Sequence, residues 1–122
     1  MVERLDNTGG LLMRELTVEP ITNQSFSAVL NENLFTFRLC NRGGTVLIDI
    51  TKNNVVVVSG ARVVAGAPIV QPFSLLLGEN FVVTTQAGAL VDYHQFGITQ
   101  FLFYVRFDDV QQREIRIPVP LV

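Results

Sequence analysis

Apolar and polar side chains alternate along most of this chain with the two-residue period of a β-strand. Between residues 35 and 40 the alternation holds at every position, in the order Phe35, Thr36, Phe37, Arg38, Leu39, Cys40. Short runs rich in valine, isoleucine, phenylalanine and threonine are separated by glycine, asparagine and proline, which is typical of strands joined by turns. No stretch sustains the period of an amphipathic helix. The pattern therefore predicts an all-β chain.

The apolar runs predict strands over residues 14–18, 25–30, 34–40, 46–51, 55–59, 73–77, 81–85 and 101–107. Asn53 and Asn54 stand between two such runs and predict a two-residue hairpin turn. Consecutive strands with short links are expected to lie side by side. About eight strands in one domain indicate a small antiparallel β-barrel or a tight sandwich.

Two further patterns concern the later part of the chain. The run 101–107 is apolar on both faces, which predicts a central strand or one whose outer face is covered by a partner. In the segment 108–122, Pro118 and Pro120 remove backbone donors, so this segment is expected to be an edge strand or an extended arm. We therefore predict an N-terminal arm over 1–13, a β-barrel domain over 14–107 and a C-terminal arm over 108–122.

Composition narrows the functional classes. The chain has 122 residues, 48% of them hydrophobic and 16% charged, which is enough to build one domain with an excess of apolar surface. No apolar run reaches the length of a membrane helix, so we expect that excess to enter a core and an interface in an assembly. The net charge is −2 and Lys52 is the single lysine, which argues against a protein that binds nucleic acid by neutralising phosphates. Cys40, the single cysteine, is expected to be an inert and partly buried thiol.

The sequence offers few groups for chemistry. His94 is the single histidine and lies next to Asp92 and Tyr93. One histidine without a further cluster of metal-binding residues is weak evidence for a metal site. We interpret it as a loop histidine that hydrogen-bonds locally. The pair Asp108 and Asp109 is interpreted as a solvated turn rather than a cation site. We therefore predict no catalytic residue, no cofactor-binding residue, no metal ligand and no enzyme, while a small hydrolase centred on His94 remains an alternative.

Glycines and aromatic residues are the remaining candidates for a binding role. Gly43 and Gly44 lie between two strands and indicate a hairpin turn, because a phosphate loop needs a following helix. The aromatic residues could stack on bases if a barrel face exposed them; they are Phe73, Phe81, Phe96, Phe101, Phe103 and Phe107. Arg106 is almost the only cation among them, which favours core packing. An oligonucleotide-binding β-barrel module is nevertheless the alternative function.

Several short motifs, in a fixed order, resemble a known family. They cover residues 19–30, 47–50, 63–69, 81–83, 92–97 and 102–105. In this order they resemble the phage tail family named after the baseplate plug protein of a cyanophage with a contractile tail. The resemblance spans about residues 14–106. At Thr45 and Val46 the chain departs from its relatives, which often carry a tryptophan there, and this departure bears on local core packing.

The resemblance implies a β-barrel structural protein of the tail baseplate, near the hub and the end of the tail tube. It would act as a plug or a bridge through contacts with other baseplate, hub or tail-tube proteins, and it would bring no catalytic residues. We expect a homo-oligomer in a symmetric assembly, with its arms along neighbouring subunits. No membrane and no sequence-specific nucleic acid are expected as partners. The implied location is the virion, after synthesis in the host cytoplasm.

Overall fold

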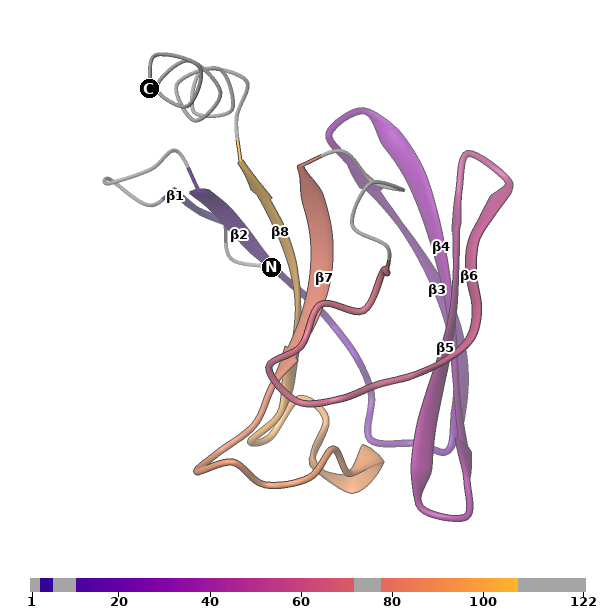
Figure 1. The fold of residues 1–122 in the computed structure, drawn as a ribbon, viewed down its shortest axis with the longest axis vertical. Helices are drawn as coiled ribbons and strands as arrows, with labels where there is room; N and C mark the ends of the chain where they lie inside the picture. Colours follow the sequence, from indigo (N-terminus) through magenta and orange to yellow (C-terminus); the bar gives the residue numbers. More distant parts are fainter. Residues whose placement is uncertain (1–2, 6–10, 72–77, 108–122) are drawn as a thin grey trace, which may run out of the picture.

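The structure of the chain, a computed structural model, describes residues 3–5, 11–71 and 78–107. The described residues form eight strands, labelled in Figure 1, and one turn of 3-10 helix. In chain order the elements are β1 (Glu3–Leu5), β2 (Leu11–Leu16), β3 (Asn23–Leu30), β4 (Asn33–Arg42), β5 (Thr45–Lys52), β6 (Val55–Arg62), β7 (Glu79–Thr84), η2 (Tyr93–Gln95) and β8 (Phe101–Phe107). The strand predicted over residues 73–77 lies outside the described residues.

The strands form two four-stranded sheets that face each other (Figure 1). Sheet A has the order β1-β2-β8-β7, and sheet B has the order β3-β4-β5-β6. Every strand pairing in both sheets is antiparallel. The prediction of an all-β antiparallel fold is therefore confirmed in its sandwich form.

The barrel form of the prediction is wrong. No ladder among the described strands joins sheet A to sheet B. Residues 63–71 leave the end of β6 and cross to the edge of β7, where the Gly66 N–H donates to the carbonyl of Val83 at 2.9 Å. The Ile69 N–H donates to the carbonyl of Phe81, also at 2.9 Å. Because this crossing segment occupies the edge of β7, β6 does not pair with it and the two sheets stay open.

Sheet B is the meander that the sequence predicts. Asn53 and Asn54 turn between β5 and β6 with φ of 51° and 68°, and Asn31 and Glu32 turn between β3 and β4 with φ of 52° and 66°. Two successive residues with positive φ are what a type I′ hairpin turn needs. Asparagine adopts this conformation at low cost, so the turn chemistry agrees with the fold.

The strand directions place the connections at two opposite ends of the sandwich. The β3–β4 and β5–β6 turns lie at one end, which we call the hairpin end (upper part of Figure 1). The opposite end, which we call the loop end, carries residues 17–22, 43–44, 63–66 and 85–100.

The core lies between the sheets and is rich in aromatic side chains. Phe35 and Phe37 extend from β4 of sheet B, and Phe81 and Tyr104 extend from sheet A; each is at most 1% exposed. The Phe81 ring centroid lies 5.3 Å from that of Phe35, 5.1 Å from that of Phe37 and 5.6 Å from that of Tyr104. These are favourable edge-to-face and tilted contacts. The alternating pattern of β4 thus points its phenylalanines at the opposite sheet.

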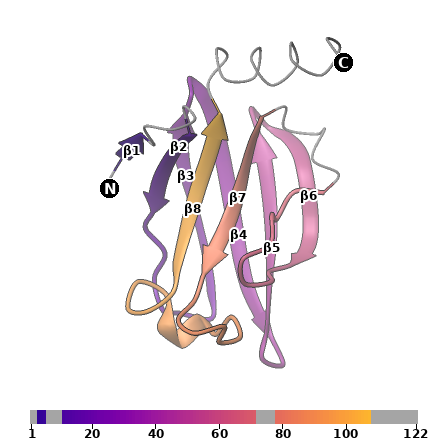
Figure 2. The ribbon, with the colours of Figure 1, turned by 60° about the vertical axis from the view of Figure 1, so that its left-hand side comes forward.

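The prediction for the run 101–107 is confirmed, because β8 lies between β2 and β7 in sheet A (Figure 2). Part of the predicted N-terminal arm is in the same sheet: β1 pairs with β2, and β2 begins at Leu11. The predicted C-terminal arm, residues 108–122, lies outside the described residues. The division into a domain and two arms remains a prediction.

Candidate functional site

The histidine of the sequence lies in the short 3-10 turn at the loop end. Asp92 caps this turn, and its Oδ1 accepts a hydrogen bond from the His94 backbone N–H at 3.0 Å. The His94 Nδ1 lies 2.7 Å from the same oxygen. These two hydrogen bonds hold the pKa of the Asp92 carboxyl below its usual range. The predicted local hydrogen bonding of His94 is therefore confirmed.

Within the described part of the chain, no nucleophile hydrogen-bonds to this pair. Both hydrogen bonds that His94 makes in the described part of the chain go to Asp92, and its ring stacks on Tyr93 with a centroid distance of 3.9 Å. The His94 and Asp92 side chains are 65% and 50% exposed, so they lie in water and not in a cleft. Residues 11–71 and 78–107 contain no cluster of three or more His, Cys, Asp or Glu that could hold a metal ion. The arrangement closes a turn.

The other sequence candidates also occupy structural positions. Gly43 and Gly44 form the β4–β5 turn with φ of 57° and 85°, as predicted. Cys40 is a free and partly buried thiol on β4. Asp108 and Asp109 lie outside the described residues.

A charged network at the hairpin end was missed by the sequence reasoning. Lys52 of β5 places its Nζ 2.7 Å from Oε2 of Glu79 on β7, and the Tyr104 hydroxyl donates to Oε1 of the same carboxylate at 2.5 Å. The Glu79 side chain is only 6% exposed. Burial and the adjacent carboxylate raise the pKa of Tyr104 above its usual value. The network joins sheet B to sheet A. The pairing partners are 27 and 25 residues apart, so no local sequence signal could have indicated it.

The loop end exposes four large apolar side chains on three separate connections. They are Ile21 at 49% exposed, Val64 at 51%, Leu90 at 84% and Ile98 at 62%. Ile21 lies between β2 and β3, Val64 follows β6, and Leu90 and Ile98 both lie between β7 and β8. Among the described residues, the other exposed large apolar residues are Val29, Leu34, Val55 and Val56, which lie at the hairpins of sheet B. Single exposed apolar residues are ordinary, whereas apolar residues brought together from separate connections form a candidate contact surface. The four loop-end side chains, which we call the loop-end apolar set, are the candidate functional site.

Two grooves adjoin the loop-end apolar set. One, of about 290 Å³, is lined by Val64, Arg62 and Leu90 together with the β4–β5 turn. The other, of about 310 Å³, lies between residues 15–20 and residues 96–102 and includes Ile98 in its wall. Both are shallow and partly apolar, a shape that suits side chains of a protein partner more than a small molecule.

The charges and aromatic residues are not arranged for base stacking. Phe81 and Phe96 are buried, while Phe101 and Phe103 are partly exposed on the outer side of sheet A. The exposed Arg38 and Arg62 lie on sheet B, on the other side of the sandwich. Stacking of a nucleic-acid strand needs cations interleaved with the aromatic residues. Phe73 lies outside the described residues, as does the side chain of Phe107.

The comparisons with known proteins agree with a contact role. No helix in the described part of the chain is long and apolar enough to cross a bilayer. A search of curated proteins gives no match for the chain. The family model described as cyanophage baseplate Pam3 plug gp18 matches residues 13–108, which is most of the chain. The chain therefore belongs to the family of the cyanophage baseplate Pam3 plug gp18, and it is a structural component of a phage tail baseplate in the virion and not an enzyme.

Proposed function

We propose that this baseplate protein acts near the hub and the end of the tail tube, as a plug or a bridge held by protein-protein contacts. The observation that carries the proposal is the loop-end apolar set. Its four side chains lie on three connections that are distant in sequence but share one end of the sandwich. A partner that covered this end would contact all four at once and would remove their apolar surface from water.

The sandwich itself suits a component that must stay rigid under load. Its core is closed by aromatic side chains from both sheets, and the hairpin end is tied by the Lys52–Glu79–Tyr104 network. A rigid body that presents apolar loops can be held firmly without rearranging on assembly. The proposal therefore assigns the loop end to a neighbouring hub or tail-tube protein.

The proposal also includes a role for the predicted arms. Within the segment 108–122, residues 115–121 alternate apolar residues with arginine and proline, which suits an extended strand laid along a neighbouring subunit. It follows β8 directly and would leave the sandwich at the hairpin end, opposite the loop-end apolar set. A subunit held at both ends is suited to bridging two layers of an assembly.

Co-expression with the hub and tail-tube proteins of the same phage genome tests the proposal. The double variant Leu90→Asp and Ile98→Asp places two charges in the loop-end apolar set, and both residues are more than half exposed, so the fold should be unaffected. We expect co-purification of this variant with its partners to fall about tenfold or more. A chain that ends at Phe107 is expected to fold and likewise to be lost from the complex.

The matched control is the double variant Leu90→Met and Ile98→Met, which keeps both positions apolar and should co-purify as the wild type does. Circular dichroism establishes that each variant is folded. Retention of the aspartate variant at the wild-type level would refute the assignment of the loop end, and normal incorporation of the truncated chain would refute the arm.

A further inference from the structure

The outer side of sheet A is more apolar than the solvated side of an antiparallel sheet usually is. Register places the side chains of β2, β8 and β7 there in cross-strand rows, of which the middle one is Glu15, Phe103 and Val82. The described members are all partly exposed; they are Met13, Glu15, Asn80, Val82, Thr84, Phe101, Phe103 and Val105. We call this the aromatic face.

The aromatic face has no covering element in the described part of the chain (Figure 2). Among its described side chains, Glu15 is the one charge, and it stands beside Phe103 in the middle row. Rows of large apolar side chains on an outer sheet face are a feature of interfaces, because packing another surface on them removes that area from water.

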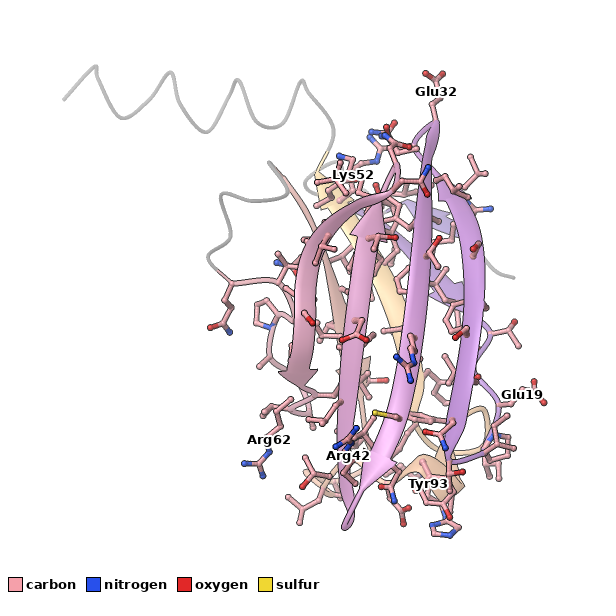
Figure 3. The ribbon with its side chains drawn as sticks, turned by 90° about the vertical axis from the view of Figure 1, so that its right-hand side faces the viewer. Glu19, Glu32, Arg42, Lys52, Arg62 and Tyr93 are labelled. Carbon is pink, nitrogen blue, oxygen red and sulfur yellow. The ribbon has the colours of Figure 1, made fainter. Side chains whose placement is uncertain are left out.

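The outer side of sheet B has the opposite character (Figure 3). Arg38, Arg42 and Arg62 are exposed on it, beside hydroxyl side chains of β3, β4 and β5. The apolar Val29, Cys40 and Leu47 share this side by register. Figure 3 shows Arg42 and Arg62 toward the loop end of this side. Asp49 is the one acidic side chain among the described strand residues that point outward here. We call this the arginine face.

Arg38 lies in the middle of the arginine face and has no ion pair with the described residues. Asp49 is directly opposite Arg38 in register, but its Oδ1 accepts a hydrogen bond from the Gly60 N–H at 2.5 Å. Gly60 has φ of 64° and lies where the β5–β6 register shifts, so a bulge in β6 turns its N–H toward this carboxylate. Beside Arg38 there is a hollow of about 280 Å³, whose walls include Val56 and Thr51.

We propose that the aromatic face of one copy of this chain packs on the arginine face of the next copy, with Glu15 against Arg38 and Phe103 in the adjoining hollow. Each of these groups lies near the middle of its sheet, so one superposition of the two faces can satisfy both contacts. The charges of the described side chains favour this pairing: one carboxylate on one face meets three arginines and one aspartate on the other.

The same charges disfavour each face packing on its own copy. Two aromatic faces would bring two Glu15 carboxylates together, and two arginine faces would bring together six guanidinium groups. Because the two contact faces lie on opposite sides of one chain, the contact is heterologous and repeats from copy to copy, closing a ring or extending a stack. The inference concerns the purified chain alone and does not depend on the hub or tube contacts proposed above.

Sedimentation velocity of the purified full-length protein, from about 1 to about 200 µM, tests the inference. We expect species larger than the monomer to appear over this range. Glu15→Arg and Arg38→Glu should each weaken association about tenfold or more, because each places like charges at the centre of the contact. Phe103→Ser should weaken it similarly through the loss of apolar contact.

The decisive measurement is whether variants with swapped charges at Glu15 and Arg38 recover the association that each single variant loses. An equimolar mixture of E15R and R38E should associate within about threefold of the wild type, because every contact in an alternating assembly then pairs opposite charges. The double variant E15R/R38E should associate likewise. Glu19→Arg, which makes the same charge change at an exposed position outside both faces, is the matched control and should leave association unchanged.

A wild-type protein that stayed monomeric up to about 200 µM would overturn the proposal. So would a failure of the mixture to associate when both single variants are folded by circular dichroism. If Phe103→Ser abolished association while Arg38→Glu had no effect, the aromatic face would have a different occupant, and the pairing of the two faces would be wrong.

Discussion

The ion pair between Lys52 and Glu79 offers a direct test of what holds the two sheets together at the hairpin end. Lys52 Nζ lies 2.7 Å from the Glu79 carboxylate, but the two side chains differ in exposure, at 30% for Lys52 and 6% for Glu79. Lys52→Met would leave a buried carboxylate with the Tyr104 hydroxyl as its remaining partner in the network. Glu79→Gln would leave a cation that can turn toward water. The two single changes should therefore be unequal in cost.

The exposures set the magnitudes. Removing one partner of a fully buried pair costs about 3–5 kcal/mol, because the other charge is left buried without compensation. Since water reaches Lys52 and screens the pair, we expect Lys52→Met to lower the free energy of unfolding by about 2–3 kcal/mol. Glu79→Gln keeps an oxygen that accepts from Tyr104 and should cost about 1 kcal/mol. The double variant should lie within about 0.5 kcal/mol of Glu79→Gln alone, since it contains no buried charge.

Urea unfolding at pH 7, followed by circular dichroism, measures these differences. The protein concentration must be low enough that the midpoint does not depend on it, and a reductant keeps Cys40 as a thiol. Lys52→Arg, which keeps the positive charge, is the control and should cost less than Lys52→Met. If Lys52→Met cost no more than Glu79→Gln, or if the two changes were additive, the argument from buried charge would be refuted.

Two further predictions concern a tyrosine and a glycine. Burial and Glu79 raise the pKa of Tyr104, so the hydroxyl loses its proton at a lower pH in the unfolded chain than in the folded one. The free energy of unfolding therefore keeps its full value below the ordinary tyrosine pKa near 10. Above that pH it falls by up to about 1.4 kcal/mol per pH unit. Urea unfolding between about pH 9 and 11 should show this fall in the wild type and a smaller one in Tyr104→Phe, and equal slopes would contradict the assignment. Gly97 has φ of 79°, and an added Cβ would lie 3.1 Å from the Val18 carbonyl oxygen, whereas Gly88 at φ of 73° has open space. Gly97→Ala should therefore lower the free energy of unfolding by about 2 kcal/mol, and Gly88→Ala by about 1 kcal/mol, as measured by urea unfolding. If Gly88→Ala cost more than Gly97→Ala, the close approach of residue 97 to the Val18 carbonyl would not be a source of strain.

Local patterns indicated strands β2 to β8 and the tight hairpin turns of this protein, but not β1, which lies in the predicted N-terminal arm. The alternation around Phe35 and Phe37 identified β4 and the face that it buries, because side chains of a strand point alternately to its two sides. The hairpin at Asn53 and Asn54 was predictable because few residues accept two successive positive φ angles. The apolar character of both faces of residues 101–107 indicated a central strand or one covered by a partner, and β8 is central in sheet A.

For the candidate site, the sequence predicted the local role of His94 but not the surface that the loops form. The position of His94 between Tyr93 and Gln95, close to Asp92, indicated a locally bonded loop residue, and the structure confirms it. The loop-end apolar set was not predictable, because its four members are isolated apolar residues spread over three connections. Nothing in the order of the residues states that these connections meet at one end; the directions of the strands decide that.

The sequence by itself determined that this chain is β-stranded and antiparallel, and it determined where the hairpins turn. It also determined that the chain has more apolar residues than a soluble single domain usually carries. Whether the strands close into a barrel or form two open sheets was decided by the segment 63–71, which hydrogen-bonds to the edge of β7 in place of β6. The tertiary structure also decided that Lys52 meets Glu79, and that the aromatic and arginine faces lie on opposite sides. The physical reason is that alternation specifies which side chains share a face of one strand, whereas sheet order and packing specify which faces meet.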